Sequence, residues 1–189
     1  MPSPELDGQP VFYYDLGSPV CYLAAETISS TLPVAAEWEP VLASQLDVPE
    51  PPLDRAWVEQ RSVELGIQPL CWPEAWPPDS ALAMQAATYA KGIGRVVAFS
   101  LAAFRQAFAA GRDLGDRDTV LIAGAACEMH PSALLKGIAL RSVAEGLERA
   151  NAKARAAGVL ALPAIAVSGD VFAGADAVRD AALALEAVR

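Results

Sequence analysis

The stretch Pro10-Val-Phe-Tyr-Tyr-Asp15, followed by Leu16-Gly17-Ser18-Pro19, decides how the fold begins. β-Branched and aromatic residues dominate the first segment, which predicts a strand. The Gly break and the Ser-Pro pair predict a helix start, because Ser favours the N-cap and Pro the first helical position. We expect this helix to run from Pro19 to about Ser30, and the apolar run Pro33–Trp38 predicts a second strand. Together these elements make a βαβ unit.

The C-terminal end of the chain returns to strand chemistry. Gly158–Pro163 leads into Ala164–Val167, and the turn Ser168-Gly169-Asp170 joins this run to Val171-Phe172. Two short runs joined by a Gly-Asp turn predict a β-hairpin. A last helix is expected from about Ala175 to the end of the chain.

The middle of the chain is predicted to be helical. Pro-rich stretches at 47–53 and 71–78 flank a short helical segment. From Ser80 to about Ala157 the pattern is almost wholly helical, with breaks at glycines and at His130-Pro131. We expect four or five helices in this block, the last starting near Ser142.

The order of elements predicts an α/β fold, βαβ…ββα, with a large all-helical insertion between the two halves. The expected domains are residues 1–48 plus 158–189, which build the sheet, and residues 49–157, which form the helical insertion. The tryptophans are expected to pack the insertion against the sheet, although Trp72 and Trp76 could line an aromatic substrate pocket.

The net charge of −9 argues against one class of partner. Residues 1–80 carry 13 acidic side chains against 2 basic ones, whereas residues 81–189 carry 10 against 12. Non-specific binding to nucleic acid needs a basic footprint, so we expect none. No run of 18 apolar residues is present, and Met1–Asp7 has neither a basic nor an apolar leader pattern, so no membrane association is expected.

Three cysteines, Cys21, Cys71 and Cys127, are an odd number, with no CxxC pair and no spacing typical of zinc ligands. This pattern disfavours a disulfide framework and a structural metal site. A reducing cytoplasm is the simplest setting for such a chain.

The run Phe12–Ala24 resembles a known family signature. It reads Phe-Tyr-Tyr-Asp-Leu-Gly-Ser-Pro-Val-Cys-Tyr-Leu-Ala and is similar to the Phe-Tyr-x-Asp-x-x-Ser-Pro-x-x-Tyr-Leu pattern of 2-hydroxychromene-2-carboxylate isomerases and kappa-class glutathione transferases. Both groups belong to the wider DsbA superfamily. Further matches at Asp79–Met84, Gly158–Pro163 and Phe172–Asp176 extend the resemblance over nearly the whole chain.

The resemblance implies a thioredoxin-like fold, with glutathione or another low-molecular-weight thiol bound over the start of the first helix. Ser18 would stand where DsbA has its attacking cysteine. Pro163 would be a cis-proline, and Leu162 before it would offer its backbone to the cysteinyl part of glutathione. Asp176 would receive the γ-glutamyl end. The implied reaction is isomerisation or conjugation of an aromatic or electrophilic small molecule, and the resemblance also allows a homodimer.

Several residues depart from the family pattern. The usual Ser before the last Asp is Ala175, the Asn of the insertion motif is Asp79, and its Arg is Gln85. Segment 41–66 is short and holds no clear match for the Lys and Asn that contact glutathione in the family. These departures argue against glutathione binding more than they argue against the fold.

Each candidate residue also has a plain structural interpretation. Ser18-Pro19 is an ordinary way to begin a helix. Pro163 could simply begin an edge strand, and Asp176 could complement the dipole of the last helix. Cys21 could be a small buried residue in the first turn of its helix. If Cys21 is instead a redox-active thiol, it should be exposed and have a lowered pKa.

Three functions therefore stay open. The first is a thiol-dependent isomerase or transferase in which Ser18 donates a hydrogen bond to the thiolate at the positive end of a helix. The second is a thiol–disulfide oxidoreductase acting through Cys21. The third is a thioredoxin-fold binding module that has lost catalysis.

Overall fold

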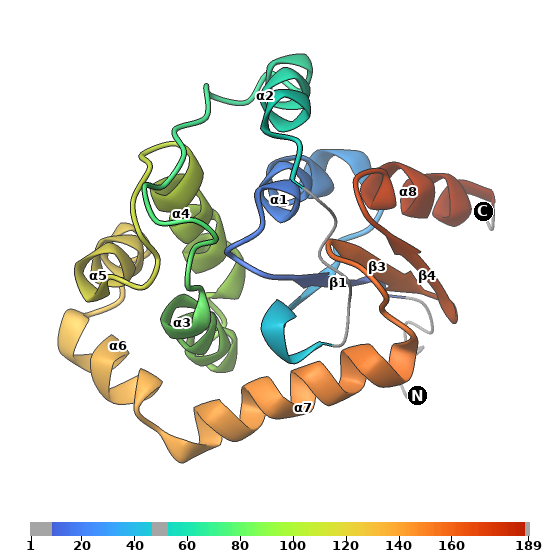
Figure 1. The fold of residues 1–189 in the computed structure, drawn as a ribbon. Coiled ribbons are helices and arrows are strands. Elements are labelled where there is room, and N and C mark those ends of the chain that lie inside the picture. Colours follow the sequence, from blue (N-terminus) through green and yellow to red (C-terminus); the bar gives the residue numbers. More distant parts are fainter. Residues whose placement is uncertain (1–8, 47–52, 188–189) are drawn as a thin grey trace, which may run out of the picture.

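A computed structural model describes residues 9–46 and 53–187 and shows the expected order of elements (Figure 1). The strands are β1 (Val11–Tyr14), β2 (Glu37–Pro40), β3 (Ala164–Val167) and β4 (Asp170–Ala173). The helices are α1 (Pro19–Thr31), the short 3-10 helix Ala43–Gln45, α2 (Arg55–Glu64), α3 (Ala81–Gly92), α4 (Val96–Phe108), α5 (Arg117–Ala126), α6 (Pro131–Ile138), α7 (Arg141–Ala157) and α8 (Ala177–Ala187). The expectations for the N-terminal leader and for the Pro-rich segment at 47–52 lie outside the described residues.

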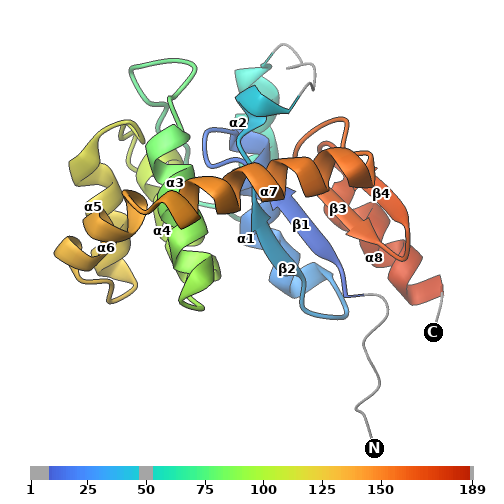
Figure 2. The same cartoon turned by 90° about the horizontal axis from the view of Figure 1, so that it is seen from below.

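The four strands form one mixed sheet in the order β2-β1-β3-β4. β1 and β2 are parallel, and β3 is antiparallel to both β1 and β4. This arrangement confirms the βαβ unit, the C-terminal hairpin and the thioredoxin-like fold. α1 and α8 cover one face of the sheet, and α7 crosses the other face (Figures 1 and 2). Helices α2 to α7 lie between the two sheet-forming ends of the chain, as expected for a helical insertion.

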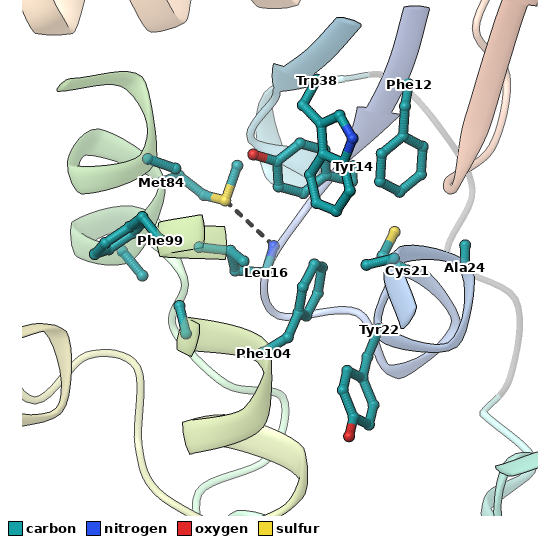
Figure 3. Packing of buried hydrophobic residues seen from close by; sticks show 14 of the residues in the cluster. Phe12, Tyr14, Leu16, Cys21, Tyr22, Ala24, Trp38, Met84, Phe99 and Phe104 are labelled. Carbon is teal, nitrogen blue, oxygen red and sulfur yellow. Dashed lines mark hydrogen bonds between the residues drawn. The ribbon is translucent and has the colours of Figure 1, made fainter. Parts of the chain in front are cut away.

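The face under α1 has an aromatic core (Figure 3). Phe12 stacks on Tyr14 with ring centroids 5.1 Å apart, and Trp38 meets Phe12 edge-on at 5.0 Å. Phe104 of α4 packs against Tyr14, with ring centroids 5.9 Å apart. The Tyr14 hydroxyl lies 2.6 Å from the Ser100 hydroxyl, so its polar end is satisfied within the core. Aromatic area buried in this way supplies much of the stability of a fold.

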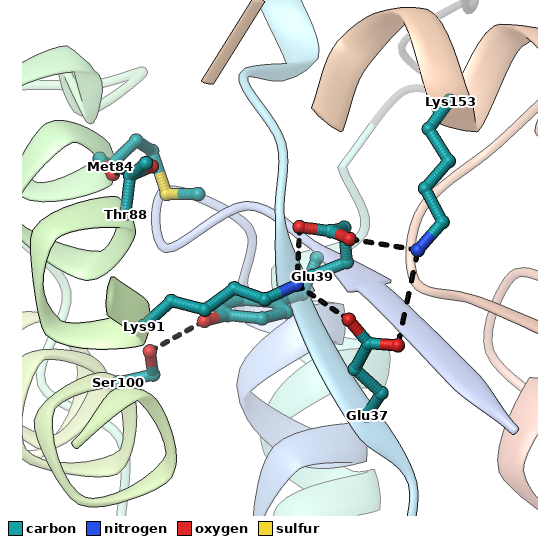
Figure 4. Close-up of polar contacts among 8 residues, drawn as sticks. Glu37, Glu39, Met84, Thr88, Lys91, Ser100 and Lys153 are labelled. Atoms are coloured by element: carbon teal, nitrogen blue, oxygen red, sulfur yellow. Dashed lines mark hydrogen bonds and ion pairs between the residues drawn. The ribbon is translucent and has the colours of Figure 1, made fainter. Parts of the chain in front are cut away.

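The face under α7 carries charge (Figure 4). Glu37 and Glu39 are two residues apart on β2 and so share a face. Lys91 at the end of α3 donates to Glu37 at 2.7 Å and to Glu39 at 2.6 Å. Lys153 of α7 donates to Glu39 at 3.0 Å and lies 3.9 Å from Glu37. We call these four residues the charge ring. It ties α3 and α7 to the edge strand β2.

Two predicted boundaries were wrong. The second strand begins at Glu37 rather than Pro33, because the ladder with β1 starts where the Glu37 N–H donates to the Pro10 carbonyl at 2.7 Å. The last helix begins at Ala177 rather than Ala175, because Gly174, with φ of 86°, first makes a turn in which its carbonyl accepts from the Ala177 N–H. The helical block has five helices, the last from Arg141, as expected. The domain boundaries stay predictions.

Two helix ends follow the expected chemistry. His130 is the N-cap of α6, where its Nδ1 accepts from the Ser132 N–H at 3.2 Å, so His130-Pro131 is a helix boundary. Gly158 ends α7 with φ of 84°, a left-handed conformation that glycine adopts without steric cost. Among the described helices, none is both long and apolar enough to cross a membrane.

Candidate functional site

Three segments distant in sequence meet where α1 begins. The last residue of β1, Tyr14, accepts from the Val41 N–H at 3.0 Å just after β2 ends. On the other side, β1 pairs with β3 through Tyr13 and Ala164. Continuing this register by one residue brings Pro163 opposite Tyr14. The sheet therefore brings the turn before α1 next to both the segment after β2 and the Leu162-Pro163 segment.

The Asp15 carboxylate organises this junction. Its side chain is buried, with Oδ1 accepting from the Gly17 N–H at 2.8 Å and Oδ2 from the Ala43 N–H at 2.7 Å. The Asp15 carbonyl also accepts from the Ser18 N–H at 3.1 Å. One residue thus fixes the turn that presents Ser18 and attaches it to the segment after β2. The sequence marks Asp15 only as part of the signature, since the contact to Ala43 depends on the fold.

Ser18 is the N-cap of α1 and is half-buried. Its Oγ accepts from the Cys21 N–H at 3.2 Å, which uses a lone pair and leaves the hydroxyl proton to donate. Pro19 has no N–H, and the Val20 N–H lies in the first turn, where an α-helix offers it no carbonyl. A hydroxyl donor, a free N–H and the positive end of the helix dipole together favour an anion such as a thiolate.

Cys21 does not meet the expectation for a redox thiol. Its side chain is fully buried and points from α1 toward the aromatic core (Figure 3). Burial raises the pKa of the Cys21 thiol to about 12, and the hydrogen bonds offered by Ser18 and by the Asp15 backbone lower it only in part. The hypothesis of an exposed Cys21 with a lowered pKa is therefore wrong, because the first turn of α1 buries this position. Cys21, Cys71 and Cys127 are all free thiols.

The Leu162–Pro163 peptide bond is cis, as the resemblance implies. The Pro163 carbonyl accepts from the Gly174 N–H at 2.8 Å, which attaches this segment to the start of the last turn before α8. Within the described ranges, neither the N–H nor the carbonyl of Leu162 has a hydrogen-bond partner. Pro163 does not begin an edge strand, because β3 lies between β1 and β4.

A groove of about 170 Å³ lies between α1, α2 and α8. It starts at Val20 in the first turn of α1, and Asp176 stands on its rim before α8. The Asp176 carboxylate is half-exposed and lies 3.1 Å from the Arg179 guanidinium. Trp57 and Arg61 of α2 form the opposite wall. The sequence alone did not single out these two residues as site residues, since nothing in the local pattern shows that α2 folds back over α1.

Trp72 and Trp76 pack against the main hydrophobic core, and their ring contacts are with each other and with residues of α2 and α4. Trp72 and Trp76 meet edge-on with ring centroids 5.3 Å apart, and the Arg55 guanidinium lies 4.8 Å and 5.0 Å from their ring centroids. The Trp72 ring also meets the Phe108 ring of α4 edge-on, with centroids 6.4 Å apart, and Trp72 Nε1 donates to the Glu59 carboxylate of α2 at 2.6 Å. The pair therefore joins α2 to α4, because its loop returns beside those helices.

Comparison with known proteins agrees with this architecture. A family model described as a DSBA-like thioredoxin domain matches residues 11–186. No curated protein matches the sequence. Among solved structures, a 2-hydroxychromene-2-carboxylate isomerase superposes with a TM-score of 0.83 at 15% identity, over 95% of each chain. A probable DsbA oxidoreductase from Streptomyces coelicolor gives a TM-score of 0.76 at 15% identity, over 95% of this chain and 89% of its own.

A third similar structure is a complex with glutathione (GSH). It is the cytosolic disulfide reductase DsbM from Pseudomonas aeruginosa with GSH, which superposes with a TM-score of 0.64 at 14% identity over 95% of this chain and 98% of its own. At such identities these structures show a shared fold.

Proposed function

The chain belongs to the DSBA-like thioredoxin domain family, and from this premise we propose that it is an enzyme that uses a low-molecular-weight thiol such as glutathione. Ser18 holds the sulfur of this thiol at the start of α1, and the substrate is an aromatic or electrophilic small molecule that is isomerised or conjugated. The observation that carries the proposal is the pairing of a half-buried Ser18 hydroxyl at the start of α1 with a fully buried Cys21 three residues later.

The residues present fit a glutathione-like thiol at three points. Ser18 and the first-turn N–H of Val20 suit a sulfur anion. The unpaired backbone groups of Leu162 suit the peptide groups around the cysteinyl residue. Asp176 suits the γ-glutamyl ammonium, which would share the carboxylate with Arg179. The DsbM structure with GSH supports a thiol ligand on this fold.

The chemistry then follows from what Ser18 does to the sulfur. When bound, the thiol supplies a nucleophile that can add to a conjugated double bond, permit rotation about it and leave again. The Ser18 hydroxyl favours the thiolate by a charge-assisted hydrogen bond, which lowers the thiol pKa. Cys21 stays protonated and does not compete for the substrate. The similarity in fold to a 2-hydroxychromene-2-carboxylate isomerase supports isomerisation over redox chemistry.

Calorimetric titration of the reduced protein with glutathione tests the proposal. We expect saturable binding that Ser18→Ala weakens by about tenfold, the cost of one hydrogen bond to a charged group. Ser30→Ala is the matched control, because Ser30 is an exposed serine at the far end of α1 and donates to the Thr27 carbonyl. Equal affinity in the wild type and Ser18→Ala would contradict the role of Ser18. No binding of glutathione or of other small thiols would favour a non-catalytic binding module.

A further inference from the structure

A second groove lies away from Ser18, between the last turn of α3 and the first turns of α7. Its volume is about 480 Å³. The α7 residues that line it, from Ser142 to Lys153, recur every three or four positions and so form one stripe of the helix. The Ser18 site lies where α1 begins, whereas α7 crosses the opposite face of the sheet (Figures 1 and 2). The two grooves are therefore separate sites.

One end of this groove is cationic. The charge ring supplies Lys91 and Lys153, which are balanced by Glu37 and Glu39. The two ammonium groups have six N–H donors, of which three make the hydrogen bonds of the ring. Arg149 adds a third cation, and across the described part of the chain it has neither an ion pair nor a hydrogen bond. The groove thus has unused donors and one positive charge in excess.

The other end of the groove is apolar and faces solvent. Ile93, just after α3, is 49% exposed, and Leu140, just before α7, is 50% exposed. Leu140 and Arg149 are nine positions apart in sequence, which is about 13 Å along the helix axis. The Tyr89 ring lines the groove and is held against α6 at Gly137, where a Cβ would meet the ring. The wall is therefore formed before any ligand arrives.

We propose that this groove binds a small organic anion with an apolar body, of the alkyl carboxylate class. The carboxylate accepts hydrogen bonds from Arg149 and the free donors of Lys91 and Lys153. The alkyl chain covers Ile93 and Leu140, which removes their exposed apolar surface from water. The site goes beyond the proposed thiol chemistry, since it shares no residue with the groove at α1.

NMR titration of the full chain with octanoate tests this site. We expect saturable shifts of the backbone amides of Gly92, Ile93, Val143 and Gly146, which all lie on the groove. Arg149→Ala should weaken binding about tenfold, by loss of a charge-assisted hydrogen bond. The variant should fold normally, because Arg149 is exposed on a helix and Ala has high helix propensity.

Matched controls separate this site from other outcomes. Arg141→Ala removes an arginine from the same helix that is 91% exposed and pairs with Glu145, and it should leave octanoate affinity unchanged. Acetate and octanol, each lacking one half of the ligand, should bind at least about tenfold more weakly than octanoate. Unchanged affinity in Arg149→Ala, or shifts confined to α1, α2 and α8, would overturn the proposal. Concentration-dependent shifts of the same amides without octanoate would assign the groove to a second copy of the chain and overturn it too.

Discussion

The two faces of the sheet are covered in different ways, although β1 contributes to both. Phe12 and Tyr14 point into the aromatic core under α1, whereas Tyr13 lies on the face under α7, in register with Glu39 of the charge ring. The aromatic side chains of the first face are buried away from water, and α1 packs on them. The charged face retains partly hydrated donors at the edge of a groove. The proposed thiol chemistry at Ser18 therefore rests on the first face, and the proposed site for a carboxylate rests on the second.

The largest expected effect concerns thiol reactivity on the aromatic face. Burial raises the pKa of Cys21 from 9.0 to about 12, so its thiolate fraction near neutral pH falls about a thousandfold. Cys71 is exposed, and Cys127 is buried with a pKa that burial also raises. Labelling of the native protein with an aromatic disulfide reagent should show one fast thiol, and Cys71→Ser should remove it. A fast thiol that remains in Cys71→Ser but not in Cys71→Ser with Cys21→Ala would restore the redox hypothesis.

The next largest effect is a cavity in the aromatic core. Phe104 is fully buried and contacts the rings of Tyr14 and Tyr22. Phe104→Ala should lower the free energy of unfolding by about 3–5 kcal/mol, measured by urea denaturation. Val97→Ala, on the same helix at 39% exposure, is the control and should change it by less than about 0.5 kcal/mol. Similar small losses in both variants would show that the aromatic face is not the main apolar core.

A smaller loss of stability is expected from substitutions on the charged face. The Glu39 side chain is 10% exposed and accepts from both Lys91 and Lys153. Glu39→Gln should lower the free energy of unfolding by about 1.5–3 kcal/mol, because hydrogen bonds between charged groups are lost in a partly buried place. Lys153→Met removes only the outer, 48% exposed partner and should lower it by less than about 1 kcal/mol. The reverse order of these two losses would contradict Glu39 as the centre of the ring.

The sequence predicts the aromatic face far better than the charged face. Phe12, Tyr14 and the Ser18-Pro19 helix start lie within eight residues, so local pattern and family resemblance suffice to place the strand, the helix and the candidate Ser18. The cis bond before Pro163 also follows from the resemblance. Asp176 lines the groove that starts at Val20 of α1, and the binding roles of Leu162 and Asp176 stay predictions.

The charge ring could not be predicted, because its lysines are 52 to 116 residues away from its glutamates in sequence. Glu37 and Glu39 alternate along β2, which signals a shared face, but no local pattern indicates that α3 and α7 place lysines over it. Trp57 and Arg61 were missed as groove residues for the same reason: the position of α2 over α1 is a tertiary contact. A homodimer and a cytoplasmic setting stay predictions.

The smallest effect is the pH dependence of the ring. The hydrogen bond from Lys91 holds the pKa of Glu37 below its usual value, with Lys153 acting in the same direction and partial burial opposing it. A carboxylate with a lowered folded pKa stabilises the fold above its unfolded pKa of about 4.3, and this contribution is lost as pH falls through the folded pKa. Glu37 is 41% exposed, so solvent screening keeps the contribution below about 1 kcal/mol.

Urea denaturation of the wild type and of Glu37→Gln between pH 3 and pH 7 measures this contribution. The wild type should have the larger free energy of unfolding at pH 6 to 7. The difference between the two proteins should narrow below about pH 4 as Glu37 is protonated. Added salt should also narrow the difference at pH 7, because the pair is partly exposed and screened. A difference in the free energy of unfolding that stays constant across this pH range would mean that Glu37 acts by packing alone. The charged face would then be stabilised by packing, as the aromatic face is.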